Sequence, residues 1–316
     1  MNAVHGVRVR VPATIGNVGS GFDALGLALT WYNTVEVERT NDVEPLVTIE
    51  VSGEGCDELP RDATNVCYRA FMRACEIANC PPPPICMRLH NTIPLARGLG
   101  SSATARIGGI LAANALLGNA LTQAQILSLA SQLEGHPDNV APALLGGLVI
   151  SGWCTDEYDE GQGDVFALRI NVTAPLHVIV MVPFRPIATA DARRVLPARV
   201  SLRDAVFNVS RACLVVGALA VGEFHHLREA VRDKLHQQYR QQLMPWLSAV
   251  MECAMECGAL GACLSGAGSS VVAFTDDESK AESIAQAMIG ALREHGEDGF
   301  TRTVHVDNDG AHMEWW

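Results

Sequence analysis

Apolar residues recur along the chain with two spacings, which together predict a mixture of strands and helices. Alternating or short apolar runs predict strands over 7–11, 34–38, 46–51, 85–89, 177–182, 271–274 and 301–306. Helical spacing predicts helices over 65–78, 101–117, 205–220, 226–235, 245–257 and 278–295. Thr122, followed three residues later by Gln125, forms a capping-box pattern and opens a further helix that runs to about Glu134.

The order of these elements favours an α+β fold, because strands occur in pairs and helices are interspersed irregularly rather than in strict alternation. The 316 residues are enough for two domains. The pattern changes at Gly146 to Gly152, and a Gly- and Asp-rich stretch from Asp156 to Asp164 then indicates an exposed loop. We therefore expect one domain over residues 1–155 and a second over residues 156–316.

The composition is that of a folded protein, with 48% hydrophobic and 18% charged residues. A net charge of −12 argues against nucleic acid or an anionic membrane as the main partner. It leaves phosphate ligands open, since free N–H groups at a helix start can bind them in an acidic protein. The first residues lack the apolar segment of a signal peptide, and no uninterrupted apolar run reaches membrane-spanning length, so we expect no span.

The chain has 10 cysteines and no CxxC pair. Zinc-ligand spacing is therefore missing, and a structural zinc site is disfavoured. Most cysteines lie among apolar residues, so we expect reduced, buried thiols of the kind found in cytoplasmic proteins.

The strongest chemical signal is the segment Pro94 to Ala103, PLARGLGSSA, at the start of a predicted helix. Gly98 and Gly100 permit a tight turn, and the unpaired N–H groups of the first helical turn attract an anion. The segment lacks the lysine of a Walker A loop and is not GxGxxG, which disfavours those two phosphate sites. The alternative is a glycine turn capped by serine. Two glycines further along this helix, at 108 and 109, cost about 1 kcal/mol each and predict close approach of another backbone.

This segment resembles the phosphate-binding motif of the GHMP kinases. Two further segments agree in order and spacing: residues 11–26, which begin VPAT and end GFDALG, resemble the N-terminal motif of that family, and residues 264–269, LSGAGS, resemble its third motif. The resemblance implies a two-domain fold with an N-terminal nucleotide-binding domain and a C-terminal ferredoxin-like domain. It also implies ATP and Mg²⁺ as cofactors.

Within the family, the chain is most similar to members that phosphorylate the side-chain hydroxyl of L-homoserine for threonine biosynthesis. The similarity lies in residues 17–23, in EGHPDNVAP at 134–142, in residues 189–197 and in residues 239–245. Departures occur at residues 15–16, 20 and 269–270. The resemblance implies ATP and L-homoserine as small-molecule partners, a homodimer and a cytoplasmic location. The alternatives are a GHMP kinase with mevalonate or a sugar as acceptor, and a non-catalytic metabolite sensor, which would be expected to have lost a glycine, Glu134 or Asp138.

The resemblance also assigns roles to individual residues. It implies ATP and phosphate binding by Asn65, Pro94, Leu95, Ala96, Arg97, Gly98, Leu99, Gly100, Ser101, Ser102 and Ala103. It places Mg²⁺ on Ser102 and Glu134, and makes Asp138 either a base or an orienting group. It implies acceptor binding by Asn17, Asp23, His136, Asn139, Thr189, Arg193, Arg240 and Gly266.

Simple chemistry agrees with several of these roles, although each residue has an ordinary structural alternative. Two guanidinium groups, Arg193 and Arg240, suit a carboxylate, and Asp23 suits an ammonium, so together they favour a zwitterion over mevalonate. A carboxylate at the end of a helix, as at Glu134, opposes the helix dipole and so favours a functional role over a solvated charge. Asn65 is equally compatible with a helix N-cap, and Asp138 with an Asx turn or cap.

Overall fold

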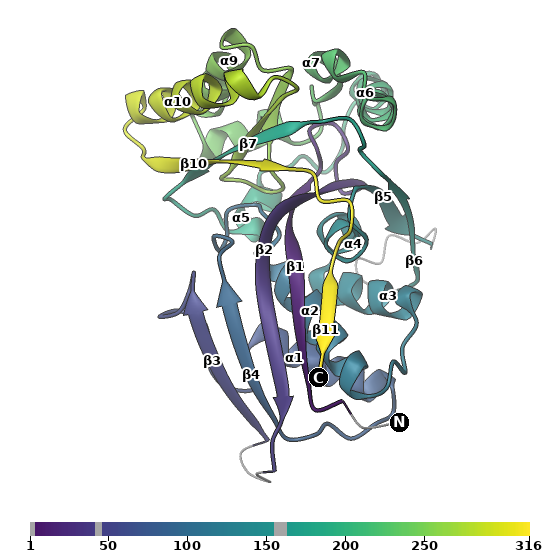
Figure 1. Ribbon diagram of the computed structural model, residues 1–316. Helices are drawn as coiled ribbons and strands as arrows, with labels where there is room; N and C mark the ends of the chain where they lie inside the picture. The colour runs from purple at the N-terminus through teal and green to yellow at the C-terminus, as the bar shows by residue number, and fades with distance from the viewer. Residues whose placement is uncertain (1–3, 42–45, 155–162) are drawn as a thin grey trace.

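Two β-sheets form the frame of the computed structural model, which describes residues 4–41, 46–154 and 163–316 (Figure 1). Within these ranges the first sheet has seven strands: β1 (Gly6–Gly16), β2 (Leu25–Arg39), β3 (Val47–Gly53), β4 (Ile85–Asn91), β5 (Leu148–Trp153), β6 (Val165–Ile170) and β11 (His312–Trp315). The second has four antiparallel strands: β7 (His177–Pro183), β8 (Gly261–Leu264), β9 (Val271–Thr275) and β10 (Gly299–His305). The α+β class is confirmed.

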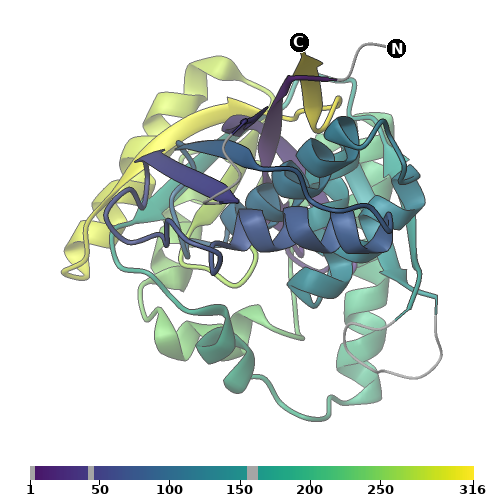
Figure 2. The same cartoon turned by 90° about the horizontal axis from the view of Figure 1, so that it is seen from below.

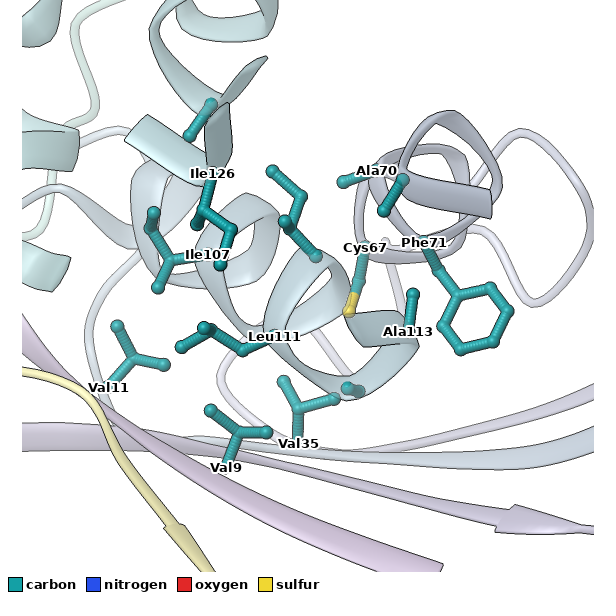
Figure 3. Close-up of a cluster of buried hydrophobic side chains, with 14 of the residues drawn as sticks. Val9, Val11, Val35, Cys67, Ala70, Phe71, Ile107, Leu111, Ala113 and Ile126 are labelled. Carbon is teal, nitrogen blue, oxygen red and sulfur yellow. The ribbon is translucent and has the colours of Figure 1, made fainter. Parts of the chain in front are cut away.

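Four helices cover one face of the first sheet: α1 (Val66–Ile77), α2 (Ser101–Leu116), α3 (Gln123–Glu134) and α4 (Pro137–Leu145) (Figures 1 and 2). The alternating valines of β1 and β2 point toward these helices, and Val11 and Val35 pack with Ile107 of α2 (Figure 3). At Gly109 the backbone of α2 meets that of α1, because an added Cβ would lie 2.2 Å from the Cys67 carbonyl oxygen. This confirms the predicted close approach.

The second sheet is covered on one face by α9 (Leu247–Glu256) and α10 (Glu278–Glu294) (Figure 1). Its other face shares a hydrophobic core with the C-terminal part of β1 and the N-terminal part of β2 in the first sheet. The register between β1 and β2 shifts at Pro12/Ala13, where two residues of β2, Thr30 and Trp31, have no opposite residue in β1. Beyond the shift, Ala13 and Ile15 pack with Val180 and Phe274 of the second sheet. The start of the loop at Asn17 is thereby held between the two sheets.

The remaining helical segments connect the sheets: α5 (Thr189–Arg194), α6 (Leu202–Val221), the 3₁₀ turn Phe224–His226, α7 (Leu227–Ala230), α8 (Gln237–Arg240) and the 3₁₀ turn Gln241–Leu243. The predicted helix over 226–235 is wrong, because only α7 forms there. Asp233 ends it by accepting hydrogen bonds from the backbone N–H groups of Leu235, His236 and Gln237, which competes with helical pairing.

The structure also contains several short helices and strands that the sequence analysis did not predict. The elements α4, α5, α8, β5, β6, β8 and β11 were not predicted. The helix α6 has the length of a membrane span and a mean hydropathy of 1.6, although only 22% of that stretch is buried. The helix itself was predicted over 205–220, but its length and hydropathy were not recognised as those of a span because Arg203, Asp204 and Arg211 interrupt the apolar residues. The predicted loop over 156–164 lies outside the described residues except for its last two positions. The division at residue 155 stays a prediction, and the first sheet takes strands from both sides of it.

Candidate active site

The glycine segment predicted to bind phosphate forms the loop that leads into α2. Gly98 and Gly100 have φ values of 73° and 70°, in the left-handed region that favours glycine, and Gly100 is the N-cap of the helix. A Cβ at Gly98 would lie 2.1 Å from the carbonyl oxygen of Ser265, and one at Gly100 would lie 2.1 Å from Oγ1 of Thr14. The loop therefore needs both glycines in order to lie against the segments that contain Thr14 and Ser265.

Hydrogen bonds join the same three segments. The Ser265 hydroxyl donates to the Gly98 carbonyl at 2.7 Å, and the N–H of Thr14 donates to the Leu99 carbonyl at 3.1 Å. The three motifs, far apart in the sequence, thus meet at one end of α2.

One pocket opens at this meeting point, between the loop, α4, α5 and α8. It is lined by Asn17, Asp23, Pro94, Ala96, Arg97, Gly98, Leu99, Gly100, Ser101, Ser102, Glu134, His136, Asp138, Asn139, Thr189, Arg193, Arg240, Gly266 and Ala267. All the predicted site residues except Asn65, Leu95 and Ala103 are in this lining, and Ala267 is an addition to it. Ala103 is buried in the core beneath the loop. Asn65 caps α1, accepting from the Cys67 N–H at 2.9 Å and donating to the Pro60 carbonyl at 2.7 Å.

Glu134 is the last residue of α3 and is brought to the loop by the turn at Gly135, with φ 91°. The Ser102 hydroxyl donates to Oε2 of Glu134 at 2.7 Å. Arg106, one helical turn beyond Ser102, hydrogen-bonds to both of these oxygens. Arg106 was missed by the sequence reading, and its guanidinium offsets the unfavourable position of a carboxylate at a helix end.

His136 and Asp138 begin α4 and form a buried pair. Oδ1 of Asp138 accepts from Nδ1 of His136 at 2.5 Å and from Asn139 Nδ2 at 3.2 Å, and Oδ2 accepts from the Asn17 N–H at 3.2 Å. Burial alone would lower the pKa of His136, but the charge and hydrogen bond of Asp138 outweigh it and raise the pKa to about 9. Burial alone would raise the pKa of Asp138, yet His136 holds it below its usual value. At neutral pH the pair is imidazolium and carboxylate.

Arg193 of α5 reaches across the pocket to Asp23. Its Nη1 and Nη2 donate to the two carboxylate oxygens at 3.0 and 3.1 Å, in a two-point geometry. Both side chains are about one-third exposed. The pair is therefore accessible to a ligand that can exchange partners with it.

Arg240 of α8 is the most enclosed cation of the pocket, with 2% of its surface exposed. It donates to the carbonyls of Gly266 at 2.9 Å and Ala192 at 3.3 Å, and to Nδ1 of His236 at 3.0 Å. Burial lowers its pKa to about 10, so the guanidinium remains charged at neutral pH. No carboxylate in the described part of the chain forms an ion pair or a hydrogen bond with it.

The backbone beside the pocket is strained at four residues that are not glycine. Asn17, Val18, Asp23 and Ala96 have φ values of 68°, 42°, 53° and 54°. Each such residue costs on the order of 1 kcal/mol and persists where the surroundings fix it. Asn17 is fixed by donating to the Gly266 carbonyl at 2.8 Å and accepting from the Asp23 N–H at 3.0 Å. This clustering is typical of a functional site.

Comparison with known proteins places the chain in a family. Residues 65–147 match the model of the GHMP kinases N terminal domain, and residues 215–294 match the GHMP kinases C terminal model. The homoserine kinase of Moorella thermoacetica is 41% identical over 303 residues, which span 96% of this chain and 98% of that protein. The chain belongs to the GHMP kinase family. It is therefore an ATP-dependent kinase that acts on a hydroxyl group, as the resemblance of its three motifs to that family implied.

Solved structures of GHMP kinases agree with the architecture. A homoserine kinase from Cytophaga hutchinsonii matches with a TM-score of 0.86 and 28% identity over 99% of both chains. A mevalonate kinase matches with a TM-score of 0.67 over 96% of this chain and 99% of that one, at 16% identity, which shows the shared fold alone. The predicted two-domain GHMP kinase fold is confirmed.

Proposed function

We propose that the protein transfers the γ-phosphoryl group of ATP to the side-chain hydroxyl of L-homoserine, giving O-phospho-L-homoserine for threonine biosynthesis. The observation that carries this choice of acceptor is Arg240, a buried guanidinium that faces the pocket and pairs with no carboxylate of the described residues. A buried charge is strongly destabilising unless it is paired, so the pocket favours a ligand that brings a carboxylate. Relatives named homoserine kinase, at 38–41% identity, support the assignment.

The neighbouring ion pair favours a zwitterion over a simple carboxylic acid. The acceptor's carboxylate would bind Arg240 and Arg193, and its ammonium would bind Asp23, so the Asp23–Arg193 pair would exchange partners. Mevalonate has a carboxylate but no ammonium for Asp23, and a neutral sugar has neither. Asn17, His136, Asn139, Thr189 and Gly266 complete the proposed acceptor site.

The loop over 94–103 is the proposed phosphate site. Its left-handed glycines turn the backbone so that the first N–H groups of α2 are free of helical partners, which suits the phosphate oxygens of ATP. Contacts from Asn65, Leu95 and Ala103 to the nucleotide remain part of the proposal. For Asn65, binding adenine requires the side chain to give up one of its two local hydrogen bonds.

Ser102 and Glu134 fit the proposed Mg²⁺ site, because a hydroxyl and a carboxylate oxygen lie 2.7 Å apart at the mouth of the loop. Bound there, the ion would supply positive charge to the phosphates. Arg106 contacts the same two oxygens and so has to move aside or share them.

Asp138 is proposed to position groups rather than to act as the base. Its oxygens already accept three hydrogen bonds, and its pKa lies below the usual value, which makes it a weak base at neutral pH. It fixes the backbone of Asn17 and keeps His136 protonated beside the pocket. Positioning and charge stabilisation account for most of the catalysis of phosphoryl transfer.

A cytoplasmic location and a homodimer are further proposals. The ten cysteines are all free, which agrees with a reducing compartment.

The test is ADP release with ATP and Mg²⁺ against L-homoserine, L-serine, mevalonate, galactose and shikimate. We expect turnover with L-homoserine only. Arg193→Ala and Arg240→Ala should each lower kcat/KM, by an amount that corresponds to a loss of roughly 2–5 kcal/mol of transition-state stabilisation. The reason is that each variant removes one of the two cations proposed to bind the desolvated carboxylate of the acceptor. Turnover with mevalonate or galactose instead would overturn the acceptor assignment and leave the kinase family intact.

A further inference from the structure

The turn between α6 and α7, at the rim of the molecule (Figure 1), carries a glutamate and two histidines whose donor atoms gather on the surface. Nδ1 of His225 lies 3.4 Å from Oε2 of Glu223, and the ring centroids of His225 and His226 are 3.9 Å apart. One donor atom from each of the three side chains lies within 4.8 Å of the other two. Within the described ranges of the chain, no other group of three His, Cys, Asp or Glu side chains is this close together.

The local sequence explains why these three side chains face outward. Gly222, with a φ of 78°, ends α6, and the 3₁₀ turn Phe224–His226 follows. Residues three apart share a face of a 3₁₀ turn, and Phe224 and Leu227, which are three apart, are only 4% and 0% exposed. These two apolar side chains anchor the turn in the core, so the glutamate and both histidines are left on the exposed side.

Backbone hydrogen bonds hold the turn in this shape. The N–H of Glu223 donates to the Ala218 carbonyl at 3.0 Å, and the N–H of His226 donates to the Glu223 carbonyl at 3.2 Å. The three donors therefore project from a fixed backbone. When a ligand binds, only their side-chain rotamers have to be ordered, which lowers the entropic cost of binding.

A surface ion pair between Glu223 and His225 is the ordinary explanation of this cluster. An exposed pair of this kind contributes little to stability. It also does not account for His226, whose side chain lies against the ring of His225 and forms no hydrogen bond or ion pair with the described residues. The side chains of Glu223 and His225 are 58% and 65% exposed, so a cation can reach them without any opening of the fold.

We propose that Glu223, His225 and His226 bind a divalent transition-metal ion, for which Zn²⁺ is the best fit. Imidazole nitrogen and carboxylate oxygen are both zinc ligands, and three protein ligands with water in the fourth position form a common zinc arrangement. Mg²⁺ prefers oxygen ligands in an octahedron, so the metal that accompanies ATP does not compete for this cluster. The cluster contains no cysteine, so the lack of CxxC spacing does not bear on it.

The ion would tie the end of α6 to the start of α7. Glu223 follows the C-cap of α6, and His226 is the N-cap of α7. The far end of α7 supports the loop beside the acceptor site, because the Ala230 carbonyl accepts a hydrogen bond from the Ser20 hydroxyl at 2.8 Å. The metal therefore stabilises an element that supports the acceptor site without contacting the acceptor.

Titration of the chelator-treated full chain with Co²⁺, a spectroscopic substitute for Zn²⁺, tests this site. We expect one equivalent to bind and to give a visible absorption band, and calorimetry with Zn²⁺ to give a micromolar dissociation constant. His225→Ala and His226→Ala should each raise that constant about 10-fold or more by removing a ligand. Excess Mg²⁺ should not displace the Co²⁺.

Two variants are matched controls. His305 also lies against a second histidine ring, that of His177 at 4.9 Å, but among the described residues neither belongs to a group of three possible ligands. His305→Ala should therefore bind Co²⁺ as the wild type does. Cys257→Ser removes an exposed thiol, another common metal ligand, and should likewise leave binding unchanged.

The melting temperature shows whether the fold arranges the ligands. Zn²⁺ at ten times its dissociation constant should raise the melting temperature of the wild type by about 2–4 °C and leave that of His226→Ala unchanged. Without metal the two proteins should unfold at the same temperature, because His226 is exposed. Binding without a rise in melting temperature would overturn the proposal, since the folded turn would then have no preference for the metal.

Three further results would also overturn it: no binding by the wild type, binding that survives both histidine substitutions, or binding that is lost in either control. Homoserine turnover with Mg²⁺, measured on the same samples, keeps this inference separate from the proposed function. Absence of turnover would bear on the proposed function alone, because none of the three ligands lines the pocket.

Discussion

Arg240 donates a hydrogen bond to Nδ1 of His236 at 3.0 Å, and Nε2 of the same ring donates to the Gly19 carbonyl at 2.6 Å. A guanidinium has no acceptor and a carbonyl has no donor, so these two contacts fix His236 as the neutral tautomer with its proton on Nε2. Burial and then the charge of Arg240 lower the pKa of His236, against the opposing charge of Asp233. His236 is a rigid, uncharged acceptor that positions Arg240 against the motif containing Gly19.

Removing this acceptor should weaken homoserine binding more than ATP binding. His236→Phe keeps a ring beside Phe22, whose centroid lies 5.3 Å from that of His236, but leaves Arg240 and the Gly19 carbonyl without this partner. An unpaired buried group costs about 1–3 kcal/mol, so we expect the KM for homoserine to rise about 10-fold or more. The KM for ATP should stay within about twofold, because the phosphate loop is untouched.

The control is His236→Gln, whose amide offers both an acceptor and a donor and should recover part of the loss. Initial rates over a matrix of ATP and homoserine concentrations separate the two KM values. An equal rise in both, with a lowered melting temperature, would mean that His236 acts only through stability.

The His136–Asp138 pair should make stability depend on pH in the alkaline range. The pKa of His136 is raised from 6.5 to about 9 in the folded chain, so the stabilisation is fully present below pH 6.5 and is lost as pH rises through 9. A shift of this size corresponds to about 3 kcal/mol in the free energy of unfolding. The lowered pKa of Asp138 acts at the other end, and its stabilisation is lost only as pH falls below the usual value of 3.8.

Urea unfolding at pH 7 and pH 10 measures this effect. His136→Asn should be less stable than the wild type at pH 7 and lose less between the two pH values. His312→Asn, at a largely exposed histidine on β11, serves as the control and should keep the wild-type slope. If His136→Asn and the wild type lose stability in parallel, the pair does not carry the pH dependence.

Alanine substitutions should distinguish the glycines of the phosphate loop, which have a positive φ and close neighbours, from glycines that have neither. Gly100→Ala places a Cβ 2.1 Å from Thr14 Oγ1 at a φ of 70°, and should lower kcat/KM for ATP at least 100-fold by displacing the start of α2. Gly290→Ala on α10 has nothing within 4 Å of the new Cβ and should leave activity unchanged while stabilising the helix slightly. ATP affinity by calorimetry and activity assays would measure both, and wild-type ATP affinity in Gly100→Ala would count against the phosphate assignment.

The sequence predicted those features whose causes are local. The capping box at Thr122 and Gln125 is confirmed, and both of its hydrogen bonds are present. The tight turn at Gly98 and Gly100 could be predicted from the sequence because a left-handed backbone conformation favours glycine. Other features depend on residues far apart in the chain. Asn208 forms a hydrogen bond with Ser20, 188 positions away, and His236 forms one with Gly19, 217 positions away. No spacing pattern in the sequence predicts either contact.

Charge partners were the least predictable part of the site. Asp23 and Arg193 were each expected to bind the acceptor, and in the structure they bind one another. Arg97, expected at the phosphates, lines the pocket but donates to the backbone carbonyls of Leu95 and Pro183 at 2.7 Å each. A flexible cation takes whichever acceptor the fold brings near, which only the tertiary structure determines.

Arg106 and the proposed metal compete for the same oxygens, because Arg106 contacts both Ser102 Oγ and Glu134 Oε2. Arg106→Gln should therefore lower the free Mg²⁺ concentration that gives half-maximal velocity several-fold, whereas Glu134→Gln should raise it about 10-fold or more by removing a ligand charge. Arg73→Gln breaks an exposed Arg–Glu pair on α1 and is the matched control. Rates measured against free Mg²⁺ at saturating ATP give the comparison. A raised requirement in Arg106→Gln would show instead that Arg106 orients Glu134 toward the metal.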